Sequence, residues 1–187
     1  KNQALEAAAH KLQQSQSDKT AADQKTLAAQ AAQAEEARLR AAAERENEML
    51  RRAQTIKNAQ VSREARGLVI NLSGKVLFDS GSSRLQTGAF GQLDEVATLI
   101  KAYPDYRVKI EGHTDASGEL LANNLLSQAR AESVSNYLNQ KGISLDHLQS
   151  VGLGPARPLV SNRTPAGRQQ NRRVEIILEH PPEKAAP

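Results

Sequence analysis

This sequence of 187 residues contains no cysteine and no tryptophan, and aromatic residues make up only 3% of it. Without cysteine the chain can form no disulfide bond, no thiolate zinc site and no cysteine nucleophile. No apolar run approaches the roughly 20 residues that a transmembrane helix needs. These absences exclude cysteine-based chemistry, and the missing cysteines leave the redox compartment of the protein undetermined.

Glycine and proline are absent from the first 66 residues, which consist mainly of Ala, Gln, Glu, Lys and Arg. These residues are strong helix formers, so we predict a helix from residue 4 to about residue 64, with one interruption at residues 15–20, where Ser17 or Asp18 would cap a new helix. Large apolar side chains are too sparse there to enclose a core. We therefore expect residues 1–66 to form a helical stalk or linker.

The same segment leaves two uses open. Leu5 and Leu12 are one heptad apart, but Lys19 and Thr26 occupy the next two heptad positions, so a two-stranded coiled coil is not assured. One use is a solvated stalk. The other is self-association, as in a coiled coil, or docking on a partner protein.

The charge of the chain is small and evenly spread. The net charge is +4, with 12 basic and 9 acidic residues up to Arg66 and 13 and 12 after it. A nucleic-acid-binding protein usually concentrates basic residues on one face. We therefore expect no nucleic-acid partner.

From Gly67 onward, apolar residues recur at the spacing of strands and helices. The pattern predicts strands at 68–72, 76–78, 106–111, 148–153 and 173–179, helices at 87–102 and 120–140, and a short helix at 165–171. In the 120–140 helix we expect Leu121, Leu125, Val134 and Leu138 on the buried face. Helices between strands indicate an α+β fold, a mixed sheet with helices packed on one face. We place this domain at residues 67–180 and expect a disordered tail at 181–187.

Three polar clusters are candidates for a site: the loop after Phe78, the GHTDASG loop at 112–118, and the Asn-Arg-Arg run at 171–173. If the first two follow parallel neighbouring strands, they meet at one end of the sheet, where ligands of open sheets bind. Asp115 and Arg130 could then hold a zwitterion, because a carboxylate pairs with an ammonium and a guanidinium with a carboxylate. On spacing alone an alternative stays open, in which Asp115 caps the helix or orders its own turn and Arg130 forms a salt bridge.

Several separated motifs occur together in one order. They are Phe78-Asp79, GHTDASG, Asn123, LSQARA at 126–131, Gly152, Gly154, Pro158, Asn162, Gly167 and NRRVE at 171–175. In order and spacing this set resembles the OmpA-like C-terminal, peptidoglycan-binding domain family, as in OmpA, Pal and MotB. The resemblance covers about residues 69–178, and it implies a β-α-β-α-β-β fold after the Ala-rich helical segment.

The resemblance also implies a function and a site. Such domains bind the stem peptide of peptidoglycan without cleaving it. Asp115 would contact the ammonium of meso-diaminopimelate, and Arg130 would contact the carboxylate on the same carbon. The residues that would line the pocket by position are Phe78, Asp79, Thr114, Asn123, Asn171 and Arg172. The loop at 80–83, Ser-Gly-Ser-Ser, departs from the more acidic or lysine-bearing loop of many members.

Other motifs predict no chemistry. His113 lies near Asp115, but the other histidines offer no metal-ligand spacing, so we expect a structural role for it. No G-x-S-x-G elbow and no Walker lysine are present. We therefore expect a protein that is not an enzyme, needs no cofactor or metal, and anchors the outer membrane or an envelope complex to the cell wall.

The implied location is the periplasm of a Gram-negative bacterium, in association with the outer membrane. The alternative function is a structural or signalling envelope protein that acts mainly through its N-terminal helix.

Overall fold

The computed structural model describes residues 2–179, with side chains described from His10 onward. The expected disordered tail at 181–187 lies outside the described residues, as do Lys1 and His180. The contacts between residues divide the chain into two compact units, Lys1–Asn47 and Glu48–Pro187. None of the described helices is both long and apolar enough to span a bilayer.

Helix α1 covers Asn2–Gln54 and supplies the described part of the first unit. The interruption predicted at residues 15–20 is wrong, because the helix continues through it and the hydroxyl of Thr20 donates a hydrogen bond back to the carbonyl of Gln16. All side chains from residue 10 to residue 45 are exposed. The side chains of residues 10–45 therefore form no core of their own.

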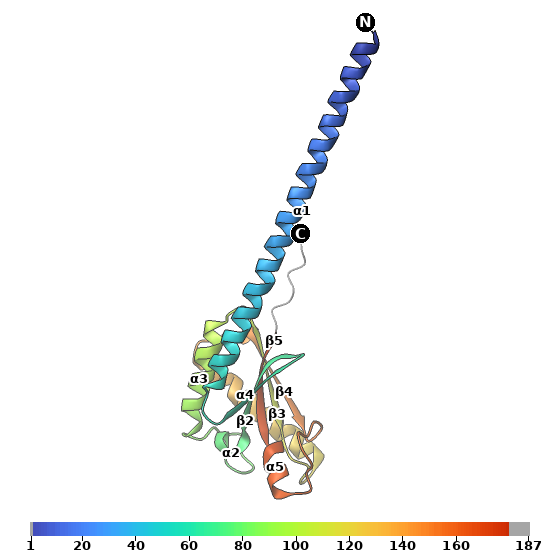
Figure 1. Cartoon of the computed structure of the whole chain (residues 1–187). Helices are drawn as coiled ribbons and strands as arrows, with labels where there is room; N and C mark the ends of the chain where they lie inside the picture. Colours follow the sequence, from blue (N-terminus) through green and yellow to red (C-terminus); the bar gives the residue numbers. More distant parts are fainter. Residues whose placement is uncertain (1, 180–187) are drawn as a thin grey trace. The chain divides into compact units, whose positions relative to one another are not determined.

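The second unit contains a five-stranded mixed sheet with the strand order β1-β2-β5-β3-β4 (Figure 1). The strands are β1 (Ala59–Glu64), β2 (Gly67–Ser73), β3 (Arg107–His113), β4 (Leu148–Gly154) and β5 (Arg173–Glu179). Strands β3 and β4 pair in parallel, and the other neighbours pair antiparallel. The predicted mixed sheet with helices is confirmed.

Strand β1 corrects the prediction of a helix up to residue 64. The helix ends at Gln54, Asn58 adopts a left-handed backbone with a φ of 55°, and β1 then forms a hairpin with β2. Val61 is the only large apolar side chain in β1, so the segment carries no strand periodicity. Its conformation is imposed by pairing with β2, in which Val61 lies opposite Ile70.

Helices connect the strands in the expected order. They are α2 (Gly74–Leu77), α3 (Ala89–Ala102), α4 (Leu120–Gln140), the 3₁₀ helix η1 (Leu145–His147) and α5 (Pro165–Asn171). The strand predicted at 76–78 is wrong: Gly74–Leu77 is one helical turn, and Phe78 forms only an isolated bridge with Leu85. Both α2 and α5 lie at one end of the sheet (Figure 1).

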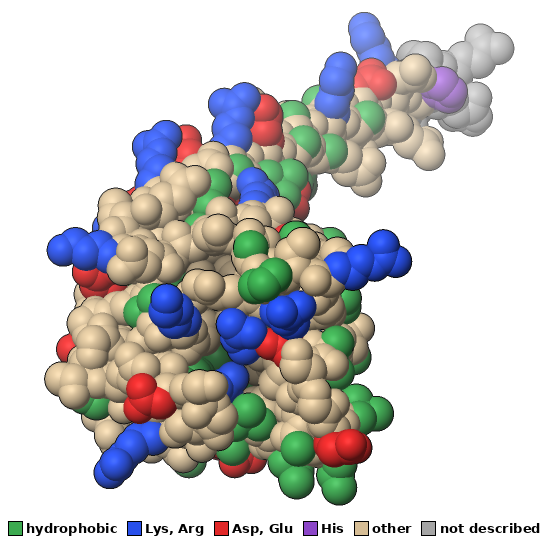
Figure 2. Space-filling view, turned by 90° about the horizontal axis from the view of Figure 1, so that it is seen from below, with side chains coloured by type: hydrophobic (Ala, Val, Ile, Leu, Met, Phe, Trp, Pro, Cys, Tyr) green, Lys and Arg blue, Asp and Glu red, His purple; other side chains and the backbone are tan. Residues whose placement is uncertain are grey.

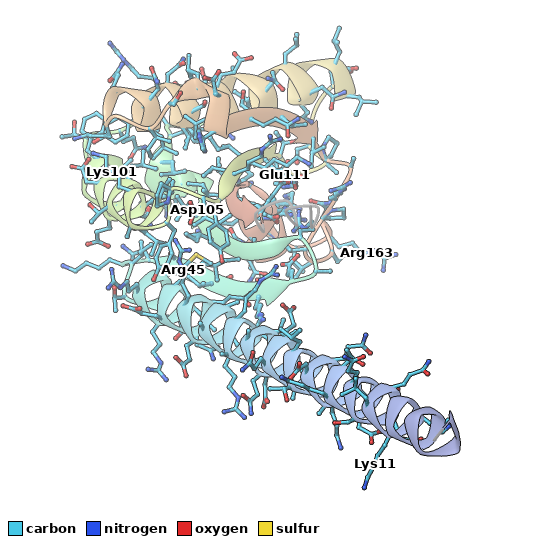
Figure 3. All side chains as sticks on the ribbon, turned by 90° about the horizontal axis from the view of Figure 1, so that it is seen from above. Lys11, Arg45, Lys101, Asp105, Glu111 and Arg163 are labelled. Carbon is cyan, nitrogen blue, oxygen red and sulfur yellow. The ribbon has the colours of Figure 1, made fainter. Side chains whose placement is uncertain are left out.

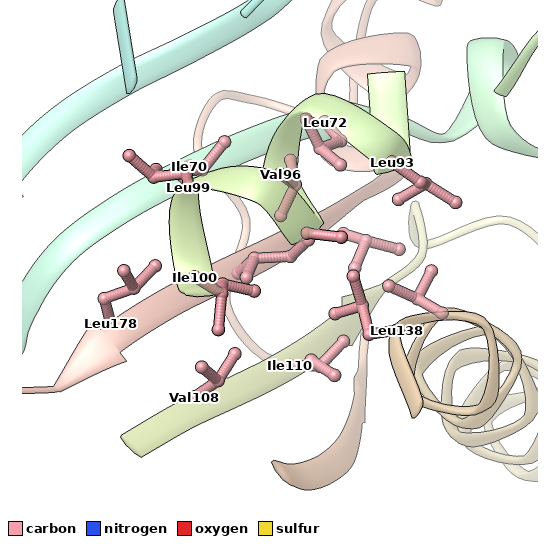
Figure 4. Close-up of a cluster of buried hydrophobic side chains, with 14 of the residues drawn as sticks. Ile70, Leu72, Leu93, Val96, Leu99, Ile100, Val108, Ile110, Leu138 and Leu178 are labelled. Carbon is pink, nitrogen blue, oxygen red and sulfur yellow. The ribbon is translucent and has the colours of Figure 1, made fainter. Parts of the chain in front are cut away.

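The core fills the space between one sheet face and the helices (Figure 4). Ile70, Val108, Ile110 and Leu178 project from the sheet onto α3 and α4, and all four are buried. The last turns of α1 and the residues after it add buried Met49, Ala53 and Ile56 to this core. The second unit therefore includes the end of α1 as well as β1.

The prediction that Leu121 and Leu125 lie on the buried face of α4 is wrong, because their side chains are 71% and 64% exposed. Val134 and Leu138, farther along the helix, are buried as expected. The reason is that only the later turns of α4 reach the core, where they pack against α3 and the sheet.

Two glycines bring α4 close to the sheet. A Cβ at Gly112 of β3 would lie 2.1 Å from the carbonyl oxygen of Ser127, and a Cβ at Gly152 of β4 would lie 2.3 Å from the backbone nitrogen of Gln128. The Ser127 hydroxyl accepts a hydrogen bond from the Gly154 amide at 2.9 Å. This close approach fixes α4, and with it Arg130, relative to the end of β3.

Candidate functional site: a charged cavity at the end of the sheet

The sheet topology brings the three polar clusters together. Strands β2 and β3 both pair antiparallel with β5, so they run in the same direction and end on either side of the start of β5. They are not direct neighbours, because β5 lies between them. The loop after Phe78, the loop after His113 and the Arg172 side chain therefore meet at one end of the sheet.

A cavity of about 350 Å³ opens at this end. Seven of the eight residues that the sequence assigns to a site line it: Phe78, Asp79, Thr114, Asp115, Asn123, Arg130 and Arg172. Lys75 and Leu126 also line it; Leu126 begins the LSQARA motif, whereas Lys75 belongs to none of the motifs. Three cations and two carboxylates thus surround one cavity. In a view onto this end of the unit, basic side chains gather near the middle with acidic atoms among them (Figure 2).

Asp115 presents its carboxylate from the loop that follows β3, and the residue is 7% exposed. One oxygen accepts a hydrogen bond from the Arg172 guanidinium, and the other accepts one from the Ser117 amide at 2.8 Å. Burial alone would raise the pKa of Asp115, but the bonds from Arg172 and Ser117 outweigh it and hold the pKa below its ordinary value. Asp115 is therefore a buried, ionised group at neutral pH.

Arg130 reaches the cavity from the third turn of α4 and is 5% exposed. Its Nε donates to the carbonyl of Ser82 at 2.9 Å, and one Nη donates to the carbonyl of Asp79 at 3.4 Å. The guanidinium lies over the Phe78 ring at 5.1 Å from the ring centre. Burial and the nearby charge of Arg172 lower its pKa, which for an arginine still leaves it charged.

Within the described residues, Arg130 forms no salt bridge, so that part of the alternative interpretation is not seen. Asp115 does order its own turn through Ser117, but it does not cap α4, whose N-cap residue is Glu119. The two charges line one cavity without bonding to each other.

Two neutral groups complete the cavity wall. Asn123 donates a hydrogen bond from its amide to the carbonyl of Ser117, which ties α4 to the Asp115 loop. Thr114 is 4% exposed, and its hydroxyl oxygen has no hydrogen-bond partner in the part of the chain that is described. Thr114 thus places an unpartnered buried hydroxyl in the wall of the cavity.

Asn171 does not line the cavity, which corrects the expectation from the resemblance. Its side-chain oxygen accepts hydrogen bonds from the amides of Leu159 and Val160, and its NH₂ group donates to the carbonyl of Val160 and to Asn162. The residue is fully buried. Asn171 therefore holds the loop before α5 and is not free to bind a ligand.

His113 points away from the cavity, toward the sheet face that does not carry the core, as do Glu111 and Glu175. Its Nε2 lies 3.8 Å from Glu175 and 4.0 Å from Glu111. Glu111 lies inside the second unit, whereas Arg163 points outward from it (Figure 3). His113, Glu111 and Glu175 could each offer one metal ligand. However, Arg66 bonds to both carboxylates at 2.8 and 2.9 Å, and Arg173 bonds to Glu175 at 2.6 Å. The carboxylates already have cationic partners, so we assign the cluster to stability.

Comparisons with known proteins find similar sequences and structures. The OmpA family model matches residues 77–172. The chain is 41% identical over 118 residues to the protein named probable lipoprotein YiaD of Escherichia coli, which covers 63% of this chain and 54% of YiaD. It is 43% identical over 105 residues to the peptidoglycan-binding protein ArfA of Mycobacterium bovis, which covers 56% of this chain and 32% of ArfA. The chain thus spans about half of the first relative and a third of the second.

Solved structures show the same fold. A MotB-like protein from Desulfovibrio vulgaris superposes with a TM-score of 0.65 at 28% identity, over 71% of this chain and 90% of that one. The family match at residues 77–172 includes the cavity-lining residues from Phe78 to Arg172.

Proposed function

Because this chain belongs to the OmpA family, we propose that it binds peptidoglycan without covalent attachment, by holding the meso-diaminopimelate of a stem peptide between Asp115 and Arg130. Members of this family are binding proteins, and the chain is not an enzyme. The observation that carries the proposal is the presence of a carboxylate and a guanidinium that line one cavity without being bonded to each other.

The charges of the cavity match a zwitterion. Asp115 would accept the ammonium of diaminopimelate, and Arg130 would bind the carboxylate on the same carbon. The Asp115 carboxylate is at present bonded to Arg172, whose side chain is 40% exposed. Arg172 can therefore turn toward the ligand carboxylate, so that two guanidinium groups would face it while Asp115 receives the ammonium.

The unpartnered hydroxyl of Thr114 supports the same placement. It is buried on the cavity wall, and leaving a polar group without a partner costs free energy. A ligand held beside Asp115 would supply that partner. The ligand-binding set that we propose is therefore Phe78, Asp79, Thr114, Asp115, Asn123, Arg130 and Arg172.

We further propose that the protein works in the cell envelope, where it anchors a membrane or an envelope complex to the wall. The support is the similarity to YiaD, named a probable lipoprotein, and to ArfA, named a peptidoglycan-binding protein. The exposed helix of residues 10–45 would act as a spacer of roughly 50 Å, at about 1.5 Å per residue.

Co-sedimentation with purified peptidoglycan tests the proposal. The protein should sediment with the insoluble wall, and a soluble stem peptide that contains diaminopimelate should release it. If the protein stays in the supernatant, peptidoglycan binding is refuted. If it sediments but the soluble peptide does not compete, the wall is bound at another site.

A further inference from the structure

A second cavity, of about 390 Å³, lies on the sheet face that the core does not use. Its wall includes Asn58, Gln60, Asn71, Ser73, Gln169 and Gln170. Gln60 pairs with Asn71 in the register of β1 and β2, and Ser73 pairs with Arg173 in that of β2 and β5, so these side chains share one face. Ile70 and Leu72, which alternate with them, point to the opposite face and into the core.

The uncharged polar side chains of this wall have no hydrogen-bond partner among the described residues. In the part of the chain that is described, the five carboxamides and the Ser73 hydroxyl make no hydrogen bonds. Carboxamides elsewhere, such as those of Gln128 and Asn171, do make hydrogen bonds. Each carboxamide offers two N–H donors and one oxygen acceptor. The wall therefore presents many donors and acceptors side by side, all available to a ligand.

The charge of the second cavity differs from that of the first. Arg173 is the charged residue on its wall, and its guanidinium is already bonded to Glu175 and to the carbonyls of Asn171 and Arg157. Its charge is thus balanced before any ligand arrives. Leu159 and Ala166 add apolar surface. This combination favours an uncharged ligand that is rich in hydroxyl and amide groups and carries small apolar groups.

The two cavities flank the same piece of backbone. Gly74 lines the first cavity and Ser73 the second, while Arg172 lines the first and Arg173 the second. The Gly74 amide donates a hydrogen bond to the carbonyl of Arg172 at 2.9 Å, which joins the two segments. One polymer that carries both a charged peptide and an uncharged sugar could therefore occupy both cavities at once.

We propose that the second cavity binds an N-acetylated amino sugar of the glycan strand, through the carboxamides of β1, β2 and α5. The sugar hydroxyls and the acetamido group match the free donors and acceptors, and the acetamido methyl group matches the apolar part of the wall. This inference rests on the proposed function, because a peptidoglycan strand supplies the sugar and the stem peptide together.

Side-chain amide signals in a nitrogen-15 NMR titration test this directly. We expect an N-acetylglucosamine trimer, used as the probe, to shift the side-chain NH₂ signals of Asn58, Asn71, Gln169 and Gln170 without shifting the backbone amides of Thr114 and Asp115. The double variant Gln169→Ala with Gln170→Ala should bind the trimer about tenfold more weakly, because two surface hydrogen bonds are lost. Gln149→Ala, an exposed glutamine of β4 away from the cavity, is the matched control and should bind normally.

A parallel titration with a diaminopimelate stem peptide separates the two ideas. If the peptide shifts Thr114 and Asp115 while the trimer shifts no carboxamide of the second cavity, the sugar inference is overturned and the proposed function stands. Shifts of those carboxamides by an uncharged alanine tripeptide, but not by the trimer, would also overturn it. If only the trimer binds, the stem-peptide site is wrong and the sugar site stands.

Discussion

Asp115 and Arg130 line the same cavity from two different elements, and each is held by a group other than its counterpart. Asp115 accepts hydrogen bonds from Arg172 and from the Ser117 amide, and Arg130 donates to the carbonyls of Ser82 and Asp79. Both side chains are thus fixed in position before a ligand arrives. A fixed pair of opposite charges loses little conformational entropy on binding a zwitterion.

Replacement of the Asp115 carboxylate by an amide should abolish most of the binding. Asp115→Asn keeps the shape of the side chain and the acceptor for the Ser117 amide, but it removes the negative charge that an ammonium needs. We expect binding to a diaminopimelate peptide to weaken by roughly 1.5–3 kcal/mol, or about 10- to 150-fold. Isothermal titration calorimetry measures this change.

The matched control is Asp146→Asn, at an exposed acid in η1. It should leave the affinity unchanged and show that loss of one negative charge has no general effect. Thermal unfolding of Asp115→Asn should remain cooperative. Wild-type affinity in this folded variant would remove Asp115 from the site.

His113 should make the fold sensitive to mild acid. The pKa of His113 is lowered to about 4, mainly by burial and secondly by the nearby charge of Arg173. The pKa in the unfolded chain is about 6.5, so the unfolded chain takes up the proton first as pH falls. The contribution of neutral His113 to stability is therefore fully present above pH 6.5 and is lost as the pH falls toward 4.

We expect the free energy of unfolding to be about 2.5 kcal/mol lower at pH 4.5 than at pH 7 because of this residue. Urea denaturation at both pH values measures it. His113→Gln should remove most of the difference, whereas His147→Gln, at an exposed histidine, serves as the matched control. Equal pH dependence in the wild type and in His113→Gln would contradict this assignment.

Two glycine substitutions should change stability in opposite directions. A Cβ at Gly112 would lie 2.1 Å from the carbonyl oxygen of Ser127, so Gly112→Ala must push α4 away, at a cost of roughly 1–3 kcal/mol or more. A Cβ at Gly91 in α3 has open space, so Gly91→Ala should stabilise the helix by roughly 0.5–1 kcal/mol. Thermal unfolding compares them. Stabilisation by Gly112→Ala would show that α4 is not tightly packed on β3.

The end of α1 and strand β1 should be necessary for the second unit. A fragment that begins at Gly67 loses β1, which leaves β2 as the edge strand of the sheet, and it also loses buried Met49 and Ile56. We expect this fragment to aggregate or to unfold at lower temperature. A fragment that begins at Glu48 should keep both the stability and the peptidoglycan binding of the full chain. Equal stability of the two fragments would place the boundary at residue 66 instead.

The elements with strong local patterns could be predicted from the sequence. The helix at 120–140 and the strand at 173–179 have the predicted bounds, because Gly142 follows the helix and the strand alternates apolar residues before Pro181. Strand β1 could not be predicted, since its strand conformation comes from pairing with β2. As a result the second cavity, of which β1 forms one wall, gave no signal in the sequence either.

The site was only partly visible in the sequence. Spacing gave no means to decide whether Asp115 and Arg130 share a cavity, and the family resemblance supplied that expectation. The Glu111 and Glu175 pair was missed because the two residues lie opposite each other in the register of β3 and β5. Such a register is set by tertiary packing and is not readable from either strand alone.

The most direct measurement compares two soluble stem peptides that differ only at the third residue, meso-diaminopimelate in one and lysine in the other. The lysine side chain keeps the ammonium for Asp115 but lacks the distal carboxylate for Arg130. We predict that the wild-type protein binds the diaminopimelate peptide at least about tenfold more tightly, and that Arg130→Gln reduces this preference strongly, leaving only the part due to Arg172. Equal affinity of the wild-type protein for both peptides would contradict the proposed site.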